Sequence, residues 1–326
     1  MSDLKTKILT AVSDDLKVIE DALADNLTPY FDLVSQVAGH ILFAGGKRLR
    51  PLLMILTARL CDYQGDHTAR FATIFEYLHA ATLLHDDLVD GADIRRGRTV
   101  AHKVWDNPTA VLTGDFLLAR GLSIAADTGL SEVIRTIARI TENMSQGEIR
   151  QLERKGDITL TEAEYLEVIR CKTAVLFEGA CRTGALVAGA SADKVAALTD
   201  YGYQLGLAFQ MADDLLDYTQ DLASLGKKAG ADLREGKLTL PLIHALSRAP
   251  EADRQRMVAI LQKSDFSEGE FADLVEMLEH HGGIAYTRTE AAARIQSAKA
   301  ALDCFDGNST RQVLMDIADY ALIRKA

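Results

Sequence analysis

The sequence predicts an all-α fold made of a single large helical bundle. Apolar residues recur every three or four positions through most of the 326 residues, which is the spacing of amphipathic helices. The chain has only 5 prolines, and no long run alternates with the period of two that is typical of strands. No tandem repeat, low-complexity segment or long linker divides the sequence, so we expect one domain spanning residues 1–326.

The composition is that of a soluble globular protein, with 48% hydrophobic and 25% charged residues. A formal net charge of -11 argues against binding to nucleic acid. The first residues lack the apolar core of a signal peptide, and no apolar run reaches the roughly 18 residues of a membrane span, so we expect a cytoplasmic protein. Four cysteines are too far apart for a CxxC pair or a zinc pattern and are expected to be buried thiols: Cys61, Cys171, Cys181 and Cys304.

Two residue pairs predict helix starts, because each places a capping side chain before a proline at the first helical position. These pairs are Thr28-Pro29 and Asn107-Pro108. The apolar spacing also predicts one long helix at about residues 70–89.

Three aspartates follow an apolar run at the end of this long helix. Asp86 and Asp90 are four positions apart and share a helix face, whereas Asp87 is turned about 100° away. His79 lies seven residues before Asp86 on roughly the same face, so it could touch the same ligand or be a satisfied core histidine.

The same spacing of carboxylates recurs in Asp213, Asp214 and Asp217, again after an apolar run. Clustered carboxylates repel one another and resist ionisation when desolvated, and a hard cation such as Mg²⁺ reverses both effects. Because Mg²⁺ usually keeps positions open for water and phosphate, we predict that the two clusters hold a metal-bound phosphate between them. The alternative is that both clusters are solvated helix ends.

Two basic segments flank the first cluster in the sequence. The first, expected between the second and third helices, has a glycine pair ending at Gly46 that lets the backbone turn, followed by the cations Lys47 and Arg50 just before a helix start. An ordinary solvated turn is the alternative there. Arg95 and Arg96 follow the aspartates directly, and arginine binds phosphate through two nitrogens at once.

Lysines supply further candidates. Lys172 lies on a helical pattern among small residues, so it either reaches into a cavity or extends along the surface to solvent. Lys227 and Lys237 belong to a glycine-interrupted basic loop that could close over an anion or serve as an exposed connection.

Together these segments resemble the trans-polyprenyl diphosphate synthase family, and most closely its bacterial octaprenyl and decaprenyl members, which make the ubiquinone side chain. The matching motifs are Gly45-Gly46-Lys47-Arg48-Leu49-Arg50-Pro51, Asp86-Asp87-Leu88-Val89-Asp90, Arg95-Arg96-Gly97, Gly114-Asp115, Lys172-Thr173, Phe209-Gln210, Asp213-Asp214-Leu215-Leu216-Asp217 and Glu235-Gly236-Lys237.

The resemblance implies a helical bundle of the isoprenoid synthase type around a central substrate cavity, with three Mg²⁺ ions bound together with diphosphate. The implied metal ligands are Asp86, Asp90 and Asp213, aided by Asp87, Asp214 and Asp217. The implied cationic partners of the allylic diphosphate are Arg95, Lys172, Lys227 and Lys237. The implied site for isopentenyl diphosphate is Gly46, Lys47, Arg50, His79 and Arg96, and the residues implied at the reacting centre are Thr173 and Gln210.

The implied reaction is the head-to-tail condensation of isopentenyl diphosphate with an allylic diphosphate, expected to be farnesyl diphosphate. The allylic C–O bond ionises and the alkene attacks the carbocation. No strong protein base stands out among these residues, and the resemblance implies that the departed diphosphate takes the proton. The resemblance also implies a homodimer, and we expect transient membrane contact during product release.

Two small residues form a candidate gate for chain length. In this family bulky aromatics at these positions are associated with short products. Ala81 and Thr82 are small and lie about 6 to 7.5 Å down the helix from Asp86, so a growing tail can pass and we predict a product of about C40 to C50. The floor below the gate is left open between Phe75, Leu78 and Met144.

Several alternatives remain at the level of sequence. Within the family, a farnesyl or geranylgeranyl diphosphate synthase is the main one. From other classes come a non-catalytic regulatory subunit of a heteromeric synthase, a terpene cyclase, and an HD-type metal phosphohydrolase suggested by the doublet His85-Asp86. The chain also departs from long-chain relatives at Ala231, where an aspartate is common, and at Leu238, where proline is common.

Overall fold

The computed structural model describes residues 2–219, 230–263 and 265–323, and it confirms the all-α prediction. The helices are α1 (Ser2–Ala11), α2 (Ser13–Asp25), α3 (Asp32–Leu42), α4 (Leu49–Leu60), α5 (Thr68–Val89), α6 (Ala101–Val104), α7 (Asn107–Asp127), α8 (Ser131–Glu153), α9 (Glu162–Ile169), the π-helix η1 (Arg170–Ala174), α10 (Val175–Val187), α11 (Ala192–Thr219), α12 (Ala231–Arg234), α13 (Leu240–Arg248), α14 (Glu251–Leu261), α15 (Glu268–His280), α16 (Gly283–Ala301) and α17 (Ser309–Ile323). Within the described ranges the only strands are β1 (Ile94–Arg95) and β2 (Arg98–Thr99), which pair antiparallel.

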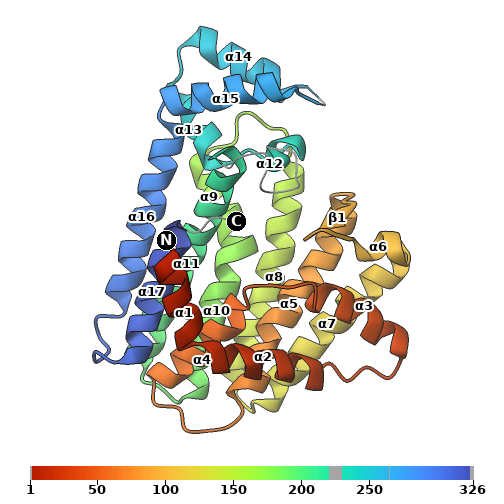
Figure 1. Cartoon of the computed structure of the whole chain (residues 1–326), viewed down its shortest axis with the longest axis vertical. Helices are drawn as coiled ribbons and strands as arrows, with labels where there is room; N and C mark the ends of the chain where they lie inside the picture. The colour runs from red at the N-terminus through yellow and green to blue at the C-terminus, as the bar shows by residue number, and fades with distance from the viewer. Residues whose placement is uncertain (1, 220–229, 264, 324–326) are drawn as a thin grey trace.

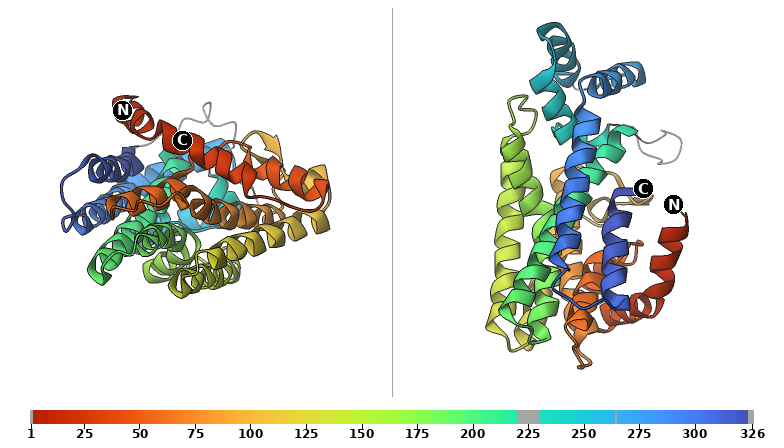
Figure 2. Two further views of the ribbon diagram at one scale, coloured as in Figure 1. Left: turned by 90° about the horizontal axis from the view of Figure 1, so that it is seen from below. Right: turned by 90° about the vertical axis from the view of Figure 1, so that its left-hand side faces the viewer.

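The long helices run side by side along the longest axis of the molecule, and α14 and α15 lie across one end (Figure 1). The two ends of the chain lie close together, where α1 packs against α17 and Lys7 pairs with Asp316 at 2.6 Å (Figure 2). Two clusters of buried apolar side chains fill the interior, and α11 contributes Leu205 to one and Leu207 to the other. A single long helix therefore joins both parts of the core.

The structure confirms one predicted helix start and corrects the other. The long helix α5 agrees with residues 70–89, and α7 begins at Asn107, although the capping side chain is that of Asp106, which accepts from the Thr109 amide at 2.7 Å. The prediction at Thr28-Pro29 was wrong, because Thr28 has a φ of 37° and α3 begins only at Asp32. The N-cap of α3 is instead Phe31, which has the extended backbone that is typical of this position.

The glycine and lysine segment near residue 46 lies between α3 and α4, one helix later than predicted. The first 25 residues form two helices rather than one, since the helix is interrupted at Val12 between α1 and α2. The segment therefore still precedes a helix start, which is now that of α4.

Close contacts bring α11 against η1 and α10. A Cβ atom at Gly206 would lie 2.5 Å from the Cα atom of Ala174, and one at Gly202 would lie 2.6 Å from the carbonyl oxygen of Phe177. Real Cβ atoms essentially never approach this closely, so only glycine permits this packing. The contact fixes where the second aspartate cluster, two turns further along α11, enters the cavity.

Arg48 anchors the loop before α4. Its side chain is buried and its Nη1 atom contacts Oε1 of Glu76 on α5 at 2.6 Å, while Nε contacts Oε1 of Glu20 on α2 at 2.6 Å. Nη2 donates to the carbonyl of Leu42 at 2.6 Å, and the backbone has a φ of 46°. Burial opposes the charged guanidinium, but the two glutamates outweigh it and raise the pKa of Arg48.

Replacing Arg48 with Met should leave the buried carboxylate of Glu76 without its partner. We expect the free energy of unfolding to fall by about 3 to 5 kcal/mol, measured by urea denaturation. The control is Arg59→Met, which removes an exposed pair with Asp15 and should change stability by less than about 1 kcal/mol. Equal losses in the two variants would contradict the anchoring role of Arg48.

Candidate active site

One cavity of about 840 Å³ collects most of the residues that the sequence singles out. Its walls come from α5, α9, η1 and α11, together with the loop before α4 and the segment after α12. The predicted residues that line it are Gly46, Lys47, Arg50, His79, Thr82, Asp86, Arg95, Arg96, Lys172, Thr173, Gln210, Asp213, Asp214 and Lys237. Segments 191 residues apart in the sequence therefore meet at one place, as the positions of Gly46 and Lys237 show.

Within the first cluster only Asp86 lines the cavity. Asp87 is buried and accepts from Nε of Arg95 at 2.6 Å, so this arginine neutralises a structural carboxylate. Asp90 caps the C-terminal end of α5 and accepts from Nζ of Lys237 at 3.1 Å. Asp87 is therefore turned away from the cavity that Asp86 lines, as the helix spacing predicts.

The second cluster divides in a similar way. Asp213 is exposed and lines the cavity. Asp214 is buried and accepts from the Tyr165 hydroxyl at 2.5 Å and from Nε2 of Gln210 at 2.8 Å. Asp217 accepts from the backbone amides of Ala231 at 3.0 Å and Asp232 at 3.1 Å, which fastens the start of α12 to α11.

A continuous hydrogen-bond chain leads from Tyr165 to the reacting centre that the sequence predicted. Asp214 holds the amide nitrogen of Gln210, so the oxygen of this amide turns to Thr173, whose Oγ1 donates to it at 2.7 Å. Both Thr173 and Gln210 line the cavity. Their orientation therefore depends on a buried aspartate and a buried tyrosine.

The carboxylates near the cavity carry an electrostatic penalty. Burial raises the pKa of Asp86 to about 6, although Lys172 opposes the rise. Burial also raises the pKa of Asp214, to which the repulsion of Asp232 adds, and it raises the pKa of Asp232, to which Asp217 adds. A cation in the cavity would relieve this penalty by favouring the charged carboxylates.

Lys172 reaches into the cavity rather than to the surface. It lies on η1, which projects it toward α8, where its Nζ atom contacts Glu148 and Gln151. Lys237 enters from the segment after α12 and contacts Glu235 at 2.6 Å in addition to Asp90. Burial opposes its charge, but the neighbouring carboxylates outweigh this and raise the pKa of Lys237.

The loop before α4 forms a basic end of the cavity with the arginines that follow α5. A Cβ atom at Gly46 would lie 3.2 Å from Nη1 of Arg96, so the glycine leaves room for this guanidinium. The guanidinium of Arg50 lies 4.8 Å from the ring centre of Phe177. Burial, with Arg50 and Arg96 nearby, lowers the pKa of His79 well below its ordinary value, so this ring is neutral at pH 7.

The donor set fits Mg²⁺ held partly by substrate. Among residues 2–219, 230–263 and 265–323, no group of three histidine, cysteine, aspartate or glutamate side chains forms a ready metal cage. Mg²⁺ is commonly bound by one or two carboxylates together with substrate phosphates, and Asp86 and Asp213 offer such oxygens from two walls of one cavity. Asp90, the third predicted ligand, is engaged by Lys237.

Among the described residues, the predicted site residues that do not line this cavity are Ala81 and Asp217, in addition to Asp87 and Asp90. Ala81 is fully buried in the main core cluster and does not line it, because its position on α5 is turned about 140° from Asp86. Asp217 accepts from the amides of Ala231 and Asp232, and of these residues Asp232 lines the cavity. Lys227 lies outside the described residues.

The cavity also contains residues that the sequence did not single out. Gln151, Arg154 and Tyr165 line it from the end of α8 and the start of α9. Gln151 lies three residues after Glu148 on the same helix face, and this spacing could have predicted that Gln151 faces the cavity. Leu238, which the sequence marked as a departure from long-chain relatives, also lines the cavity as a buried side chain.

The arrangement of His85 argues against an HD-type phosphohydrolase. Its Nε2 atom lies 3.2 Å from the carbonyl of Val111 on α7 and 3.5 Å from Asp115. A Cβ atom at Gly114 would lie 2.3 Å from the same nitrogen, so the ring packs directly on α7. His85 therefore faces away from the cavity that Asp86 lines.

Comparison with known proteins agrees with this geometry. The family described as polyprenyl synthetase matches residues 31–278. The octaprenyl diphosphate synthase of Escherichia coli (strain K12) is 35% identical over 318 residues, 98% of each chain. The short chain isoprenyl diphosphate synthase of Methanothermobacter thermautotrophicus is also 35% identical, over 94% of each chain.

A solved structure is similar over nearly the whole chain. The polyprenyl synthase from Caulobacter crescentus CB15, complexed with calcium and isoprenyl diphosphate, has a TM-score of 0.92 at 39% identity and covers 98% of both chains. With the two aspartate motifs in one cavity, these similarities identify the protein: it belongs to the polyprenyl synthetase family and is a polyprenyl diphosphate synthase.

Proposed function

We propose that this single-domain enzyme extends farnesyl diphosphate with isopentenyl diphosphate to an all-trans product of octaprenyl to decaprenyl length, for a quinone side chain in the cytoplasm. The observation that carries the chemistry is that Asp86 and Asp213, on different helices, line one cavity with Lys47, Arg50 and Lys172. Carboxylates that hold metal and cations that hold phosphate are thereby combined in one site.

The residues of the chain have distinct tasks in this reaction. Bound Mg²⁺, for which we propose three ions, supplies neutralisation of the charge that develops on the leaving diphosphate. Lys172 and Lys237 place further positive charge at the same end of the cavity, while the basic loop of Lys47 and Arg50 receives the second diphosphate. Apolar lining residues keep water from the carbocation: Leu160, Ile169, Phe209 and Leu238.

The chain length rests on the small side chains below the aspartates. Relatives of octaprenyl and of short-chain type are equally identical to this chain, so overall similarity does not decide the product. Thr82 lines the cavity with its hydroxyl bound to the His79 carbonyl at 2.8 Å, and Ala81 lies buried directly beside it. We propose that the tail passes Thr82 and enters the core near Ala81, toward Leu78 and Met144.

The first test is incubation of the purified protein with Mg²⁺, labelled isopentenyl diphosphate and farnesyl diphosphate, with the products sized by chromatography. A ladder that ends at octaprenyl to decaprenyl length supports the proposal. Products that stop at geranylgeranyl length would contradict the gate. No product with any primer would contradict catalysis by this chain alone and favour a regulatory subunit.

Replacing Ala81 with Phe should shorten the product by several isoprene units, because the ring would occupy the path of the tail. The matched control is Ala80→Phe, one position earlier on α5 and also buried, which is turned about 100° from Ala81. Thermal unfolding of both variants checks that overpacking has not unfolded them. Equal product lengths for Ala81→Phe and wild type would contradict the gate.

We also propose a homodimer through the outer faces of α7 and α8. These packed helices expose large apolar side chains, including Leu112 at 65% and Ile149 at 66%. Among the described residues, α7 alone is long and apolar enough to cross a membrane by length and composition. Of its apolar 18-residue stretch, 39% is buried in the bundle. A second copy of the chain would cover this face. Transient membrane contact during product release would then use other surfaces of the dimer.

Replacing both Leu112 and Ile149 with Asp should convert the dimer to a monomer, since each copy would then place unpaired charges in the interface. Sedimentation velocity measures the outcome. The control is Val18→Asp on α2, a residue that is 49% exposed and lies on another helix. A wild-type monomer, or a double variant that remains dimeric, would contradict this interface.

A further inference from the structure

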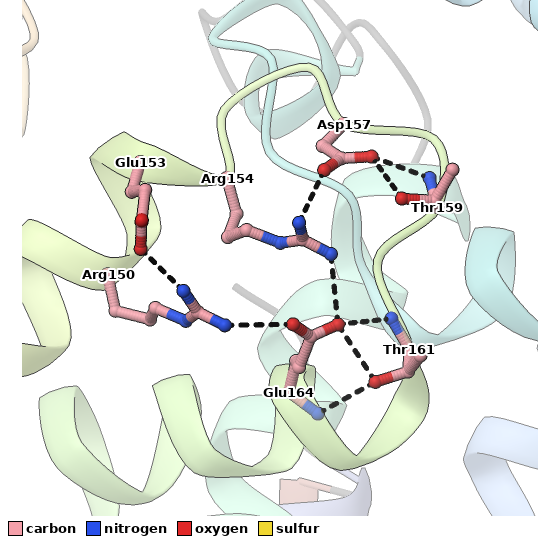
Figure 3. Close-up of polar contacts among 7 residues, drawn as sticks. All are labelled: Arg150, Glu153, Arg154, Asp157, Thr159, Thr161 and Glu164. Carbon is pink, nitrogen blue, oxygen red and sulfur yellow. Dashed lines mark hydrogen bonds and ion pairs between the residues drawn. The ribbon is translucent and has the colours of Figure 1, made fainter.

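A network of ion pairs joins the end of α8 to the start of α9 beside the cavity (Figure 3). At its centre Glu164 accepts from Nη2 of Arg150 at 2.9 Å through one oxygen and from Nη2 of Arg154 at 3.0 Å through the other. The second oxygen also accepts from the Thr161 amide at 3.0 Å, and the Glu164 amide donates back to the Thr161 hydroxyl at 3.3 Å. One carboxylate thus fixes both helix ends.

Arg154 also holds the connector between these helices, which we define as residues 154–161. Its Nη1 atom contacts Asp157 at 2.7 Å, and Asp157 in turn accepts from the amide of Thr159 at 2.8 Å and from its hydroxyl at 2.6 Å. Arg154 lines the cavity, yet both of its Nη atoms are engaged by carboxylates. Its two Nη atoms therefore hold the connector.

The connector contacts both aspartate clusters indirectly. The Gly156 amide donates to the Gly236 carbonyl at 2.8 Å, and the next residue, Lys237, reaches Asp90. At the other end of the connector, Tyr165 follows Glu164 directly and donates to Asp214. The first cluster is reached through a lysine and the second through a tyrosine.

The contact between the connector and the lysine segment is close. Gly236 has a φ of 76°, and a Cβ atom there would lie 3.0 Å from the Cγ atom of Lys155. The backbone of Gly156, with a φ of 74°, lies against the same residue. A small displacement of the connector would therefore move the segment that carries Lys237.

We propose that Arg150, Arg154 and Glu164 form a polar staple that positions Lys237 and Asp214 for the reaction. The three side chains touch neither substrate nor metal in this role. They fix the connector at residues 154–161. The connector in turn sets the distance between Lys237, which contacts Asp90, and Tyr165, which contacts Asp214. This proposal rests on the prenyltransferase activity and is independent of product length.

Glu164→Gln tests the staple, because it removes the charge that both arginines share while it keeps the size of the side chain. The matched control is Glu153→Gln, which removes the ion pair of Arg150 with an exposed glutamate of the same helix and leaves α9 untouched. We expect kcat to fall about tenfold or more in Glu164→Gln and to change less than about twofold in the control. The Mg²⁺ concentration for half-maximal rate should rise in the former only.

Hydrogen–deuterium exchange provides a readout that does not depend on activity. In Glu164→Gln the amides of residues 230–239 should exchange faster, while those of α17, which is remote from the connector, should not change. Arg154→Lys, which keeps one contact to Glu164, should recover part of the kcat that Arg154→Met loses. Wild-type exchange at residues 230–239 in Glu164→Gln would overturn the proposal, as would a loss of activity that follows only the fraction of unfolded protein.

Discussion

The meeting of two groups of aspartates at one cavity, with one buried carboxylate in each group, is the constraint on which the rest of the structure depends. Asp86 and Asp214 both pay for desolvation, as their raised pKa values show. A fold that keeps such groups needs fixed cations and hydrogen-bond donors around them, and it needs an open position for a metal–phosphate group. The surrounding helices provide both, since donors of the protein hold Asp87, Asp90, Asp214 and Asp217.

Within each aspartate motif the three carboxylates therefore make different contacts. The first aspartate of each, Asp86 or Asp213, lines the cavity, and the second is buried against an arginine or a tyrosine. The third connects the motif to the segment after α12, through Lys237 for Asp90 and through backbone amides for Asp217. Substitutions at the three positions should then differ in kind, because each position makes different contacts.

Much of this site could be predicted from short-range spacing. The i, i+4 relation of Asp86 and Asp90 and its repetition on α11 follow from the geometry of one helix. The helix start at Thr28 failed because its left-handed backbone is not visible in residue type. Tyr165 was missed because its bond to Asp214 joins segments 49 residues apart in the sequence. Arg154 pairs with the nearby Asp157 and Glu164, but no repeated motif marks these residues in the sequence.

The central claim is that Asp86 and Asp213 act together on one metal-bound diphosphate. The most direct measurement is calorimetric binding of an allylic thiolodiphosphate, which does not ionise readily, in the presence of Mg²⁺. We predict that Asp86→Asn and Asp213→Asn each weaken binding about 100-fold, and that the double variant is little weaker than either, since the two share one ligand. Losses that simply add, or wild-type affinity in one single variant, would contradict joint binding.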